Sequence, residues 1–576
     1  MRFATSPVLK LRLPLWRSRL LLLAIICAFF GLAGRAAYLQ GWNHDFLQAK
    51  GESRYSRVIE VSANRGRITD RNGELLAIST PVKSIWAIPA ELKLDARETS
   101  RLAVLFDMPP QEIGKRLADS SREFVYIKRQ IAPEIADRVA QMRIPGLFQT
   151  REYRRYYPGG EVMAHVLGFT GADDFGQEGI ELAFQKHLAG ASGSRRVIRD
   201  RLGQIIEDGK SIRAAQEGRD LALALDAKIQ SLAFVQLKTA IEHHKARAGG
   251  IVVIDIATGE VLALCNLPTY NPNNRARLSG AQLRNRAVTD LFEPGSTLKP
   301  FTVATALESG RVTPDSMIDT APGRLSIGPA TIRDAHPSGM LSVTQVIQKS
   351  SNVGAAKIAL GLPPEAMWTM FQKIGLGASP GLGFPGEANG KLRPHRSWRP
   401  IEQATMSYGH GISLSLIQLA RAYSVFARDG ELVPLSLLKT SAPPVALEVM
   451  SAHTARAVRH MLELAVGPGG TAPRAQIIGY RVAGKTGTAH KLEGGGYAVH
   501  KYVSSFVGFA PVSNPRLVIA VMIDEPSGGQ YYGGAVAAPV FAQVMAGALR
   551  LLGVPPDAPM QPIVLPPPGE EVKESV

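Results

Sequence analysis

The sequence EPGSTLKPF at residues 293–301 predicts the start of a helix that carries two reactive side chains. A proline–glycine pair comes before the serine and ends whatever element precedes it. Pro300 is tolerated only in the first turn of a helix, so the helix should begin close to Ser296. Ser296 and Lys299 are at positions i and i+3 and therefore share one face of that helix.

This pair suits a serine nucleophile that has no histidine to act as its base. A neutral lysine amine beside the hydroxyl can take the serine proton. Burial, a second cation nearby and the positive end of a helix can each make a lysine neutral. Ser-x-x-Lys alone is a weak signal, because a chain rich in serine and lysine contains it several times by chance. Its position at a helix start makes Ser296 and Lys299 candidate catalytic residues.

Two further segments carry candidate chemistry. Ser350 and Asn352 lie in a polar break within residues 343–360, which are otherwise helical in pattern. Alone, this break is better explained as a helix cap. Residues 484–489, GKTGTA, present a cation and two hydroxyl groups along a short strand punctuated by glycine. Such a strand is suited to hold a carboxylate while its backbone N–H groups face a reaction centre.

Residues 479–486 also fit the phosphate-loop pattern G-x-x-x-x-G-K-[ST], and residues 251–255 imitate the apolar strand that would end in a magnesium ligand. A phosphate loop must open a helix, whereas this segment runs into three glycines at 494–496. We therefore reject nucleotide binding. The histidines lack metal-ligand spacing, so we expect no metal and no cofactor.

Outside these motifs, the sequence divides into two regions that differ in their patterns of apolar and polar residues. From residue 221 on, short strands and helical segments alternate, which predicts an antiparallel sheet flanked by helices. The expected strands are 221–225, 250–255, 258–264, 504–510 and 517–523, and the expected helices are 228–243, 296–310, 343–360 and 413–430.

Residues 45–235 are mixed α+β in pattern and poor in chemistry. The turn at residues 71–73, Arg-Asn-Gly, lies between strand-like segments and predicts a hairpin. The charges at 151–155 and 195–201 are interspersed with tyrosines and glycines, so we expect them on a solvated or interdomain surface. No site is predicted in this half.

The N-terminus predicts a membrane anchor. Five cations and no acid occur in the first 19 residues, and the apolar run 20–34 reaches the length of a membrane span if it continues to residue 39. No Ala-x-Ala site follows, so an uncleaved anchor is favoured over a cleaved signal peptide. The positive-inside rule places the basic end in the cytoplasm and everything after residue 40 outside it.

The amino-acid composition excludes several classes of protein. The 576 residues have ordinary globular composition, which excludes wholesale disorder and a multi-span membrane protein. The net charge of +17 suggests an anionic environment, which in an exported domain is the cell envelope rather than nucleic acid. Only two cysteines, Cys27 and Cys265, occur, so neither a disulfide scaffold nor a cysteine zinc site is expected.

Taken together and in order, the three motifs resemble the signature of the penicillin-binding proteins and serine β-lactamases. The segment RGRITDRNG at 65–73 resembles the start of the non-catalytic domain of class B penicillin-binding proteins. Residues 286–296 resemble the division-specific branch, the FtsI or penicillin-binding protein 3 type. A secreted β-lactamase fits less well, because the chain is over twice the length that such an enzyme needs.

The resemblance implies an α+β fold with a single N-terminal transmembrane helix, an elongated mixed α+β platform and a C-terminal transpeptidase domain of the penicillin-binding and serine β-lactamase type. The expected parts are a cytoplasmic tail (1–19), a transmembrane anchor (20–39), a non-catalytic platform of the dimerisation type (40–235), the transpeptidase domain (236–554) and a proline-rich flexible tail (555–576).

It also implies a peptidoglycan D,D-transpeptidase that acts at the division septum. Ser296 would attack the penultimate D-Ala of a stem peptide and form an acyl-enzyme, with Lys299 taking the proton. Ser350 would relay a proton to the departing D-Ala, and Asn352 would orient Lys299 and the substrate amide. β-Lactams would acylate the same serine.

The third motif implies the substrate-binding residues. Lys485 would set the local potential, and Thr486, Gly487 and Thr488 would bind the substrate, with the two threonines holding its terminal carboxylate. The backbone N–H groups of Ser296 and Thr488 would form the oxyanion hole.

The expected location is the cell inner membrane, with one span, a cytoplasmic N-terminus and a periplasmic catalytic domain. Expected partners are stem peptides, β-lactams, the membrane, a membrane glycosyltransferase and other division proteins, but not nucleic acid. Alternatives are an elongation-type transpeptidase, a D,D-carboxypeptidase or β-lactamase-like hydrolase of the same fold, and a β-lactam receptor. A receptor should have several spans or a cytoplasmic output domain, and 19 cytoplasmic residues leave no room for such a domain.

Overall fold

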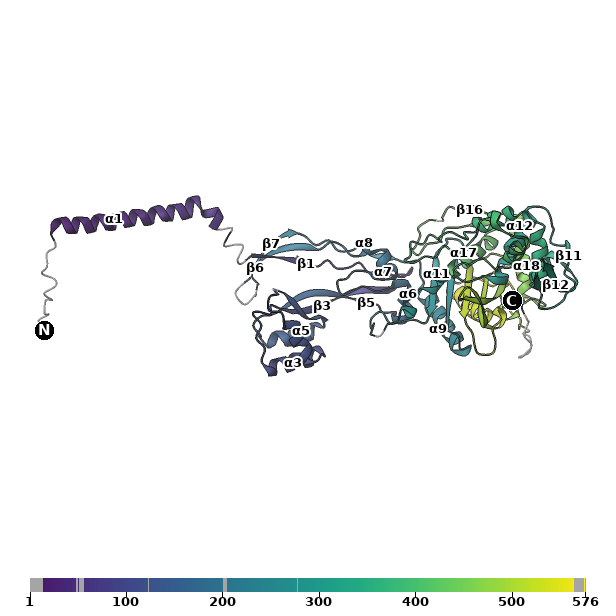
Figure 1. The fold of residues 1–576 in the computed structure, drawn as a ribbon, viewed down its shortest axis with the longest axis horizontal. Helices are drawn as coiled ribbons and strands as arrows, with labels where there is room; N and C mark the ends of the chain where they lie inside the picture. Colours follow the sequence, from purple (N-terminus) through teal and green to yellow (C-terminus); the bar gives the residue numbers. More distant parts are fainter. Residues whose placement is uncertain are drawn as a thin grey trace. The chain divides into compact units, whose positions relative to one another are not determined.

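The computed structural model describes residues 14–47, 50, 56–122, 124–199, 205–276, 278–442, 444–563 and 574 (Figure 1). It divides into two compact units. The first consists of Met1–Ala63, Lys83–Glu152 and Ala191–Gln216, and the second of Asn64–Val82, Tyr153–Gly190 and Glu217–Val576.

The first unit begins with a long apolar helix. Helix α1 (Leu15–Ala37) continues into a π-helical turn, η2 (Tyr38–Trp42), and together they form 28 residues, within which an 18-residue window has a mean hydropathy of 2.2. The predicted span 20–39 lies inside this helix, which starts five residues earlier. The apolar window is not buried against the rest of the protein, and its length and composition are sufficient to cross a membrane.

Among the described residues after Trp42, the first unit includes two small sheets and the helices α3, α4 and α5. Strands β1, β6 and β7 form an antiparallel sheet in that order, while β3 pairs with β4 and β5. Phe106 and Ile127 belong to the core under the helices. The bounds are β1 (Ser56–Val61), β4 (Val125–Ile131), β6 (Gly193–Arg199), β7 (Ile205–Arg213), α3 (Ala96–Phe106), α4 (Pro110–Leu117) and α5 (Pro133–Gln141). Strands β3 (Leu75–Ala87) and β5 (Leu147–Tyr156) have residues in both units.

The second unit contains the predicted hairpin. Strand β2 (Ile68–Thr69) runs antiparallel to the start of β3, and its other neighbour is β8 (Leu221–Ala222). Strand β8 is shorter than the predicted strand 221–225. Gly73 adopts a φ of 89° in the connecting turn, a left-handed conformation that costs glycine little. The hairpin prediction is confirmed.

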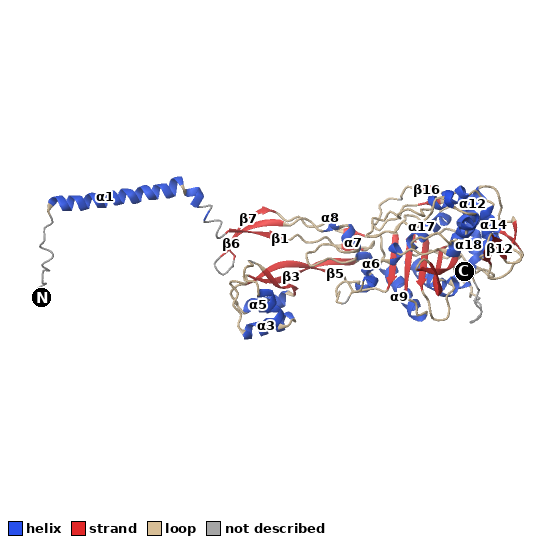
Figure 2. Cartoon of the chain, viewed as in Figure 1, coloured by secondary structure: helices blue, strands red, loops and turns tan. Residues whose placement is uncertain are grey.

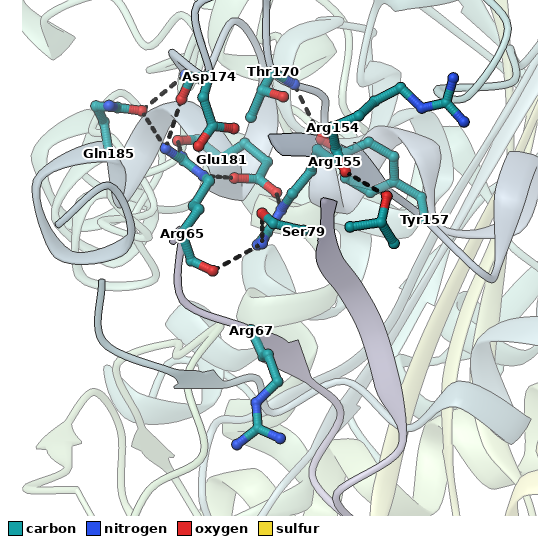
Figure 3. Close-up of polar contacts among 12 residues, drawn as sticks. Arg65, Arg67, Ser79, Arg154, Arg155, Tyr157, Thr170, Asp174, Glu181 and Gln185 are labelled. Carbon is teal, nitrogen blue, oxygen red and sulfur yellow. Dashed lines mark hydrogen bonds and ion pairs between the residues drawn. The ribbon is translucent and has the colours of Figure 1, made fainter. Parts of the chain in front are cut away.

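Arg155 corrects one expectation about surface charge. Arg151 and Arg154 are exposed as predicted, but Arg155 is buried. The carboxylate of Glu181 on α7 (Gly179–Ala183) accepts from Arg155 Nε at 2.7 Å and from Arg65 Nε at 2.6 Å (Figure 3). The prediction of a solvated Arg155 is wrong because Glu181, 26 residues away, supplies its counter-charge. Arg201, in the other predicted surface segment, lies outside the described residues.

The centre of the second unit is a five-stranded antiparallel sheet. Its order is β10-β9-β19-β18-β17, so β17 lies at an edge. The bounds are β9 (Ala248–Asp255), β10 (Val261–Leu267), β17 (Ala483–Glu493), β18 (Gly496–Ala510) and β19 (Leu517–Asp524). The predicted antiparallel sheet is confirmed, and β18 starts earlier than expected because its pairing with β17 extends to Glu493 and Gly496.

Helices cover both faces of this sheet (Figure 2). Along β9, Ile251 and Val253 pack with α9 (Ala227–His243) and α20 (Ala538–Leu551), whereas Val252 and Ile254 belong to the core on the opposite face. This alternation follows the period of two along a strand. The second face is lined by helices that include α12 (Lys299–Glu308), α17 (Leu416–Ala427) and α18 (Ala452–Val466).

The remaining elements are short. They are η3 (Gly160–Val162), α6 (Ala164–Leu167), α8 (Gln185–Leu188), α10 (Gly280–Leu283), α11 (Arg286–Thr289), η4 (Gly295–Leu298), β11 (Met317–Asp319), β12 (Arg324–Ile327), β13 (Ala330–Arg333), β14 (Met340–Ser342), α13 (Val343–Gln348), α14 (Asn352–Leu360), α15 (Pro364–Lys373), η5 (His395–Ser397), α16 (Pro400–Met406), β15 (Glu431–Leu432), β16 (Leu447–Glu448), η6 (Pro473–Ala475) and α19 (Gly533–Val536). Of the proline-rich tail, residues 566–568 lie outside the described residues, and Glu574 is buried.

Candidate active site

Ser296 and Lys299 meet at the start of a helix, as predicted. Ser296 lies in the 3-10 turn η4, and Lys299 is the first residue of α12. Ser296 is 3% exposed and Lys299 is fully buried. Lys299 Nζ donates a hydrogen bond to Ser296 Oγ at 2.8 Å. The pair therefore has the contact that a nucleophile and its base need.

Ser350 completes the surroundings of the lysine. It lies between α13 and α14 with a φ of 59°, a left-handed conformation that is unfavourable for serine. In this conformation Lys299 Nζ lies 2.6 Å from the Ser350 carbonyl oxygen and 3.1 Å from its Oγ. The predicted polar break is thus a break in the helix, and it presents two oxygens to Lys299.

The surroundings of Lys299 favour its neutral form. Burial lowers the pKa of Lys299 well below its ordinary value, and the nearby charge of Lys485 lowers it further. Asp334 and Glu574 act in the opposite direction, but burial dominates. The net effect favours the neutral amine, the form that can accept a proton.

Asp334, which no motif marks, fixes the segment that carries Asn352. Its carboxylate accepts from Ser351 Oγ at 2.6 Å and from the N–H of Val353 at 3.0 Å. Asn352 Nδ2 donates to the Arg333 carbonyl at 3.3 Å, and Asn352 Oδ1 is buried with no hydrogen-bond partner among the described residues. The side-chain carbonyl of Asn352 is therefore available to a ligand.

The GKTGTA segment lies on the edge strand β17, close to the serine. A Cβ on Gly487 would lie 2.6 Å from the Pro294 carbonyl oxygen and 2.9 Å from Thr297 Cγ2. Only glycine therefore allows the strand to approach η4 this closely. Because Lys485 lies within a strand, the rejection of a phosphate loop, which must open a helix, is supported.

Lys485 is the second buried cation of the site. Its Nζ lies 3.2 Å from Thr486 Oγ1 and 3.5 Å from Thr471 Oγ1. Burial lowers the pKa of Lys485 to about 8, and Glu574 opposes this shift. Lys485 thus keeps most of its positive charge at neutral pH.

Thr488, two residues further along β17, holds a carboxylate of the same chain. Thr488 Oγ1 accepts from the N–H of Gly533 at 3.0 Å and donates to Glu574 Oε2 at 2.8 Å. The N–H of Gly534 donates to Glu574 Oε1 at 2.8 Å. A glutamate from the C-terminal end therefore lies where the third motif was predicted to bind a carboxylate.

Comparison with known proteins agrees with this geometry. Residues 249–546 match the family described as Penicillin binding protein transpeptidase domain, and residues 60–223 match Penicillin-binding Protein dimerisation domain. This chain belongs to the penicillin-binding protein transpeptidase family. Peptidoglycan D,D-transpeptidase FtsI of Escherichia coli (strain K12) is 42% identical over 550 residues, which cover 94% of this chain and 93% of that protein. Peptidoglycan D,D-transpeptidase FtsI of Buchnera aphidicola is 37% identical over 94% of this chain and 96% of its own length.

A solved structure supports the fold. The transpeptidase domain of Burkholderia pseudomallei penicillin-binding protein 3 is 51% identical, with a TM-score of 0.55, and covers 58% of this chain and 98% of its own. The predicted class B resemblance and the predicted fold class are confirmed.

The structure brings the eight predicted site residues of this penicillin-binding protein into one buried region, in which Thr486 and Thr488 flank Gly487 on β17. One predicted contact differs: Lys299 is hydrogen-bonded to Ser350, whereas the Asn352 amide donates to Arg333. The sequence did not mark the partners of the motifs. They are Asp334, Thr471, Gly533, Gly534 and Glu574. No local pattern reveals them, because each partner lies in a different segment from the motif residue that it contacts.

Proposed function

We propose that this chain is a peptidoglycan D,D-transpeptidase that cross-links stem peptides at the division septum through an acyl-enzyme on Ser296. The observation that carries the proposal is the 2.8 Å contact between Lys299 Nζ and Ser296 Oγ, with both residues buried. Relatives named peptidoglycan D,D-transpeptidase FtsI support both the reaction and the division role.

Acylation begins with transfer of the Ser296 proton to Lys299. A neutral amine has two N–H donors and one lone pair. The Ser350 carbonyl can only accept, so one N–H of Lys299 is committed to it at 2.6 Å. The lone pair can then take the proton of Ser296 while Oγ attacks the carbonyl carbon of the penultimate D-Ala. The Ser350 hydroxyl, 3.1 Å from Lys299 Nζ, passes its proton to the nitrogen of the departing D-Ala and takes up the proton held by Lys299, which leaves Lys299 neutral again.

The negative charge that develops on the substrate carbonyl oxygen needs fixed donors. The proposed donors are the backbone N–H groups of Ser296 and Thr488, which belong to η4 and to the edge strand β17. An edge strand has N–H groups that no neighbouring strand uses. Each such donor is worth roughly 3–4 kcal/mol in the transition state of acyl transfer. The close approach at Gly487 places the two elements against each other.

Four residues bind the substrate in this proposal. The terminal carboxylate lies against the hydroxyls of Thr486 and Thr488, with the positive charge of Lys485 beside it. Asn352 Oδ1, buried without a protein partner among the described residues, accepts from an amide N–H of the stem peptide.

The acyl-enzyme is resolved by an amine of a neighbouring stem peptide, which gives a 4→3 cross-link and returns the proton to Ser296. β-Lactams acylate the same serine and stay there, because their leaving group remains tethered. A hydrolase of this fold would instead admit water, and an elongation-type enzyme would perform the same chemistry along the side wall.

The proposed placement of the chain follows the charge of its N-terminal end. The basic residues before α1 remain in the cytoplasm, α1 spans the inner membrane, and the catalytic domain is periplasmic. A membrane glycosyltransferase and other division proteins are the proposed partners. The proposed parts remain a cytoplasmic tail (1–19), an anchor (20–39), a platform (40–235), the transpeptidase domain (236–554) and a C-terminal tail (555–576).

A labelled penicillin tests this function. The expected result is a stable mass increase on the peptide that contains Ser296 in the wild type and none in Ser296→Ala. Labelling of Ser296→Ala, or release of the adduct within seconds, would contradict a transpeptidase. For the septal role, a fluorescent fusion should concentrate at the division site, and a uniform signal along the side wall would support the elongation alternative.

A further inference from the structure

The site already contains a carboxylate, that of Glu574 near the C-terminus. Glu574 is 4% exposed, although it belongs to a segment with little apolar character. Its two oxygens have different donors, Thr488 Oγ1 for Oε2 and the N–H of Gly534 for Oε1, each at 2.8 Å. A carboxylate with each oxygen separately hydrogen-bonded is a bound group, because burial without such bonds is costly.

The residues around the Glu574 carboxylate leave space for it and direct hydrogen-bond donors toward it. A Cβ on Gly534 would lie 2.4 Å from the Thr471 carbonyl oxygen and 3.1 Å from Glu574 Oε1, so only glycine leaves room for the carboxylate. Thr488 is held from its other side by the N–H of Gly533 at 3.0 Å, which directs its hydroxyl hydrogen toward the bound oxygen. The donors therefore come from two elements, β17 and α19.

The positive charge of Lys485 also favours a carboxylate at this position. Lys485 is fully buried, and Glu574 is the acidic group that offsets the effect of burial on it. A buried cation without a counter-ion from its own domain is costly, so an anionic ligand gains from binding beside it. This position coincides with the one proposed above for the terminal carboxylate of the stem peptide.

We propose that Glu574 is an internal ligand of the carboxylate subsite and that the N–H of Gly534 is a further binding group of that subsite. The C-terminal end of the chain then competes with stem peptides and β-lactams for Thr488 and Lys485. The inference rests on the proposed function, because it assigns an occupant to the substrate site of that enzyme.

The expected strength of this competition follows from tethering. Glu574 is only 574 − 563 = 11 positions beyond Ile563 in the sequence, so its carboxylate is covalently tethered to the domain by a short stretch of chain. A short tether gives an effective concentration in the millimolar range, so a carboxylate that binds weakly on its own slows acylation by roughly 3- to 30-fold. Such a ligand slows the acylation of Ser296 by substrate without preventing it.

The test compares acylation rates of the full-length chain in detergent with fluorescent penicillin. Glu574→Ala removes the carboxylate, and a truncation after Ile563 removes the whole segment but keeps Asp557, which accepts from the N–H groups of Arg481 and Ser513. Glu571→Ala is the matched control, because it removes the same charge from the same segment. We expect Glu574→Ala and the truncation to accelerate acylation of Ser296 by the same factor, and Glu571→Ala to behave as wild type.

A synthetic peptide of residues 566–576, added to the truncated chain, should slow acylation again, whereas the peptide with Glu574→Ala should not. Equal rates for Glu574→Ala and Glu571→Ala would overturn the inference. An acceleration that depends on protein concentration would also overturn it, since the occupant would then belong to a second copy. If Ser296 is labelled at unchanged rates, only this inference fails; if Ser296 is not labelled in any variant, the proposed function fails.

Discussion

Two buried polar clusters of the second unit differ in how their charges are balanced. Glu181 lies between Arg65 and Arg155 with contacts of 2.6 and 2.7 Å, so each guanidinium has a carboxylate partner. Lys299 and Lys485 are just as buried, yet among the described residues neither forms an ion pair within the transpeptidase fold. Balanced charges hold a fixed geometry, whereas unbalanced ones have shifted pKa values and become reactive.

The largest expected effect is on the unbalanced cluster. Lys299→Arg keeps a basic side chain but fixes it in the charged form, because a guanidinium does not release its proton at accessible pH. We expect acylation of Ser296 to fall by about a thousandfold or more, the upper range for loss of a general base. The second-order rate constant with labelled penicillin measures this.

The exposed Lys373, changed to arginine, serves as the control for that substitution and should react as wild type. A Lys299→Arg protein that keeps more than a tenth of the wild-type rate would show that the lysine is not the base.

The next effect is on the balanced cluster and appears in stability rather than in rate. Glu181→Gln leaves Arg65 and Arg155 buried without their counter-charge. Breaking a buried ion pair in this way lowers the free energy of unfolding by about 3–5 kcal/mol. Urea unfolding measures the loss, with Glu217→Gln on the exposed surface as control. A change below about 1 kcal/mol, the range of surface pairs, would mean that the cluster is solvated in solution.

The sequence predicted those parts of the site that depend on short-range order. A proline tolerated only in a first helical turn located Ser296 and Lys299, and a polar break located Ser350. Alternating apolar residues such as those at 251–254 predicted the buried strands of the sheet. These features follow from spacing along the chain, which a single sequence contains.

Contacts between distant segments could not be predicted in this way. The burial of Arg155 depends on Glu181, and the left-handed Ser350 presents its carbonyl oxygen to Lys299, 51 residues away in the sequence. Asp334 acts on a segment 17 residues further on. Hydrogen-bond partners that lie this far apart in the sequence do not recur at a fixed spacing. In the sequence alone, Asp334 or Glu181 therefore cannot be distinguished from an ordinary polar residue on the surface.

Asp334→Asn is expected to have a smaller effect, because it weakens the support of the site without removing a reacting group. The charged hydrogen bond from Ser351 is lost. The free energy of one such bond corresponds to about a tenfold decrease in rate. Asp334 raises the pKa of Lys299, so its neutralisation lowers that pKa further. Lys299 is then neutral at lower pH, and the acid limb of the rate profile moves toward lower pH.

The pH profile separates this electrostatic effect from a merely structural one. The exposed Asp315, changed to asparagine, is the control and should leave the acid limb in place. An unshifted acid limb in Asp334→Asn would remove Asp334 as a positioning residue.

The smallest expected effect lies on the alkaline side of the same profile and distinguishes the two lysines from each other. Lys485 must be charged to hold a carboxylate, and its pKa is lowered to about 8. As pH rises from 7 to 8, the charged fraction should fall roughly twofold, and the acylation rate with it. Lys299 must be neutral, so its titration makes the rate rise with pH and cannot cause this decline. Arginine in place of Lys485 should abolish the alkaline limb because it stays charged, and a flat wild-type profile between pH 7 and 9 would mean that burial does not control the charge of Lys485.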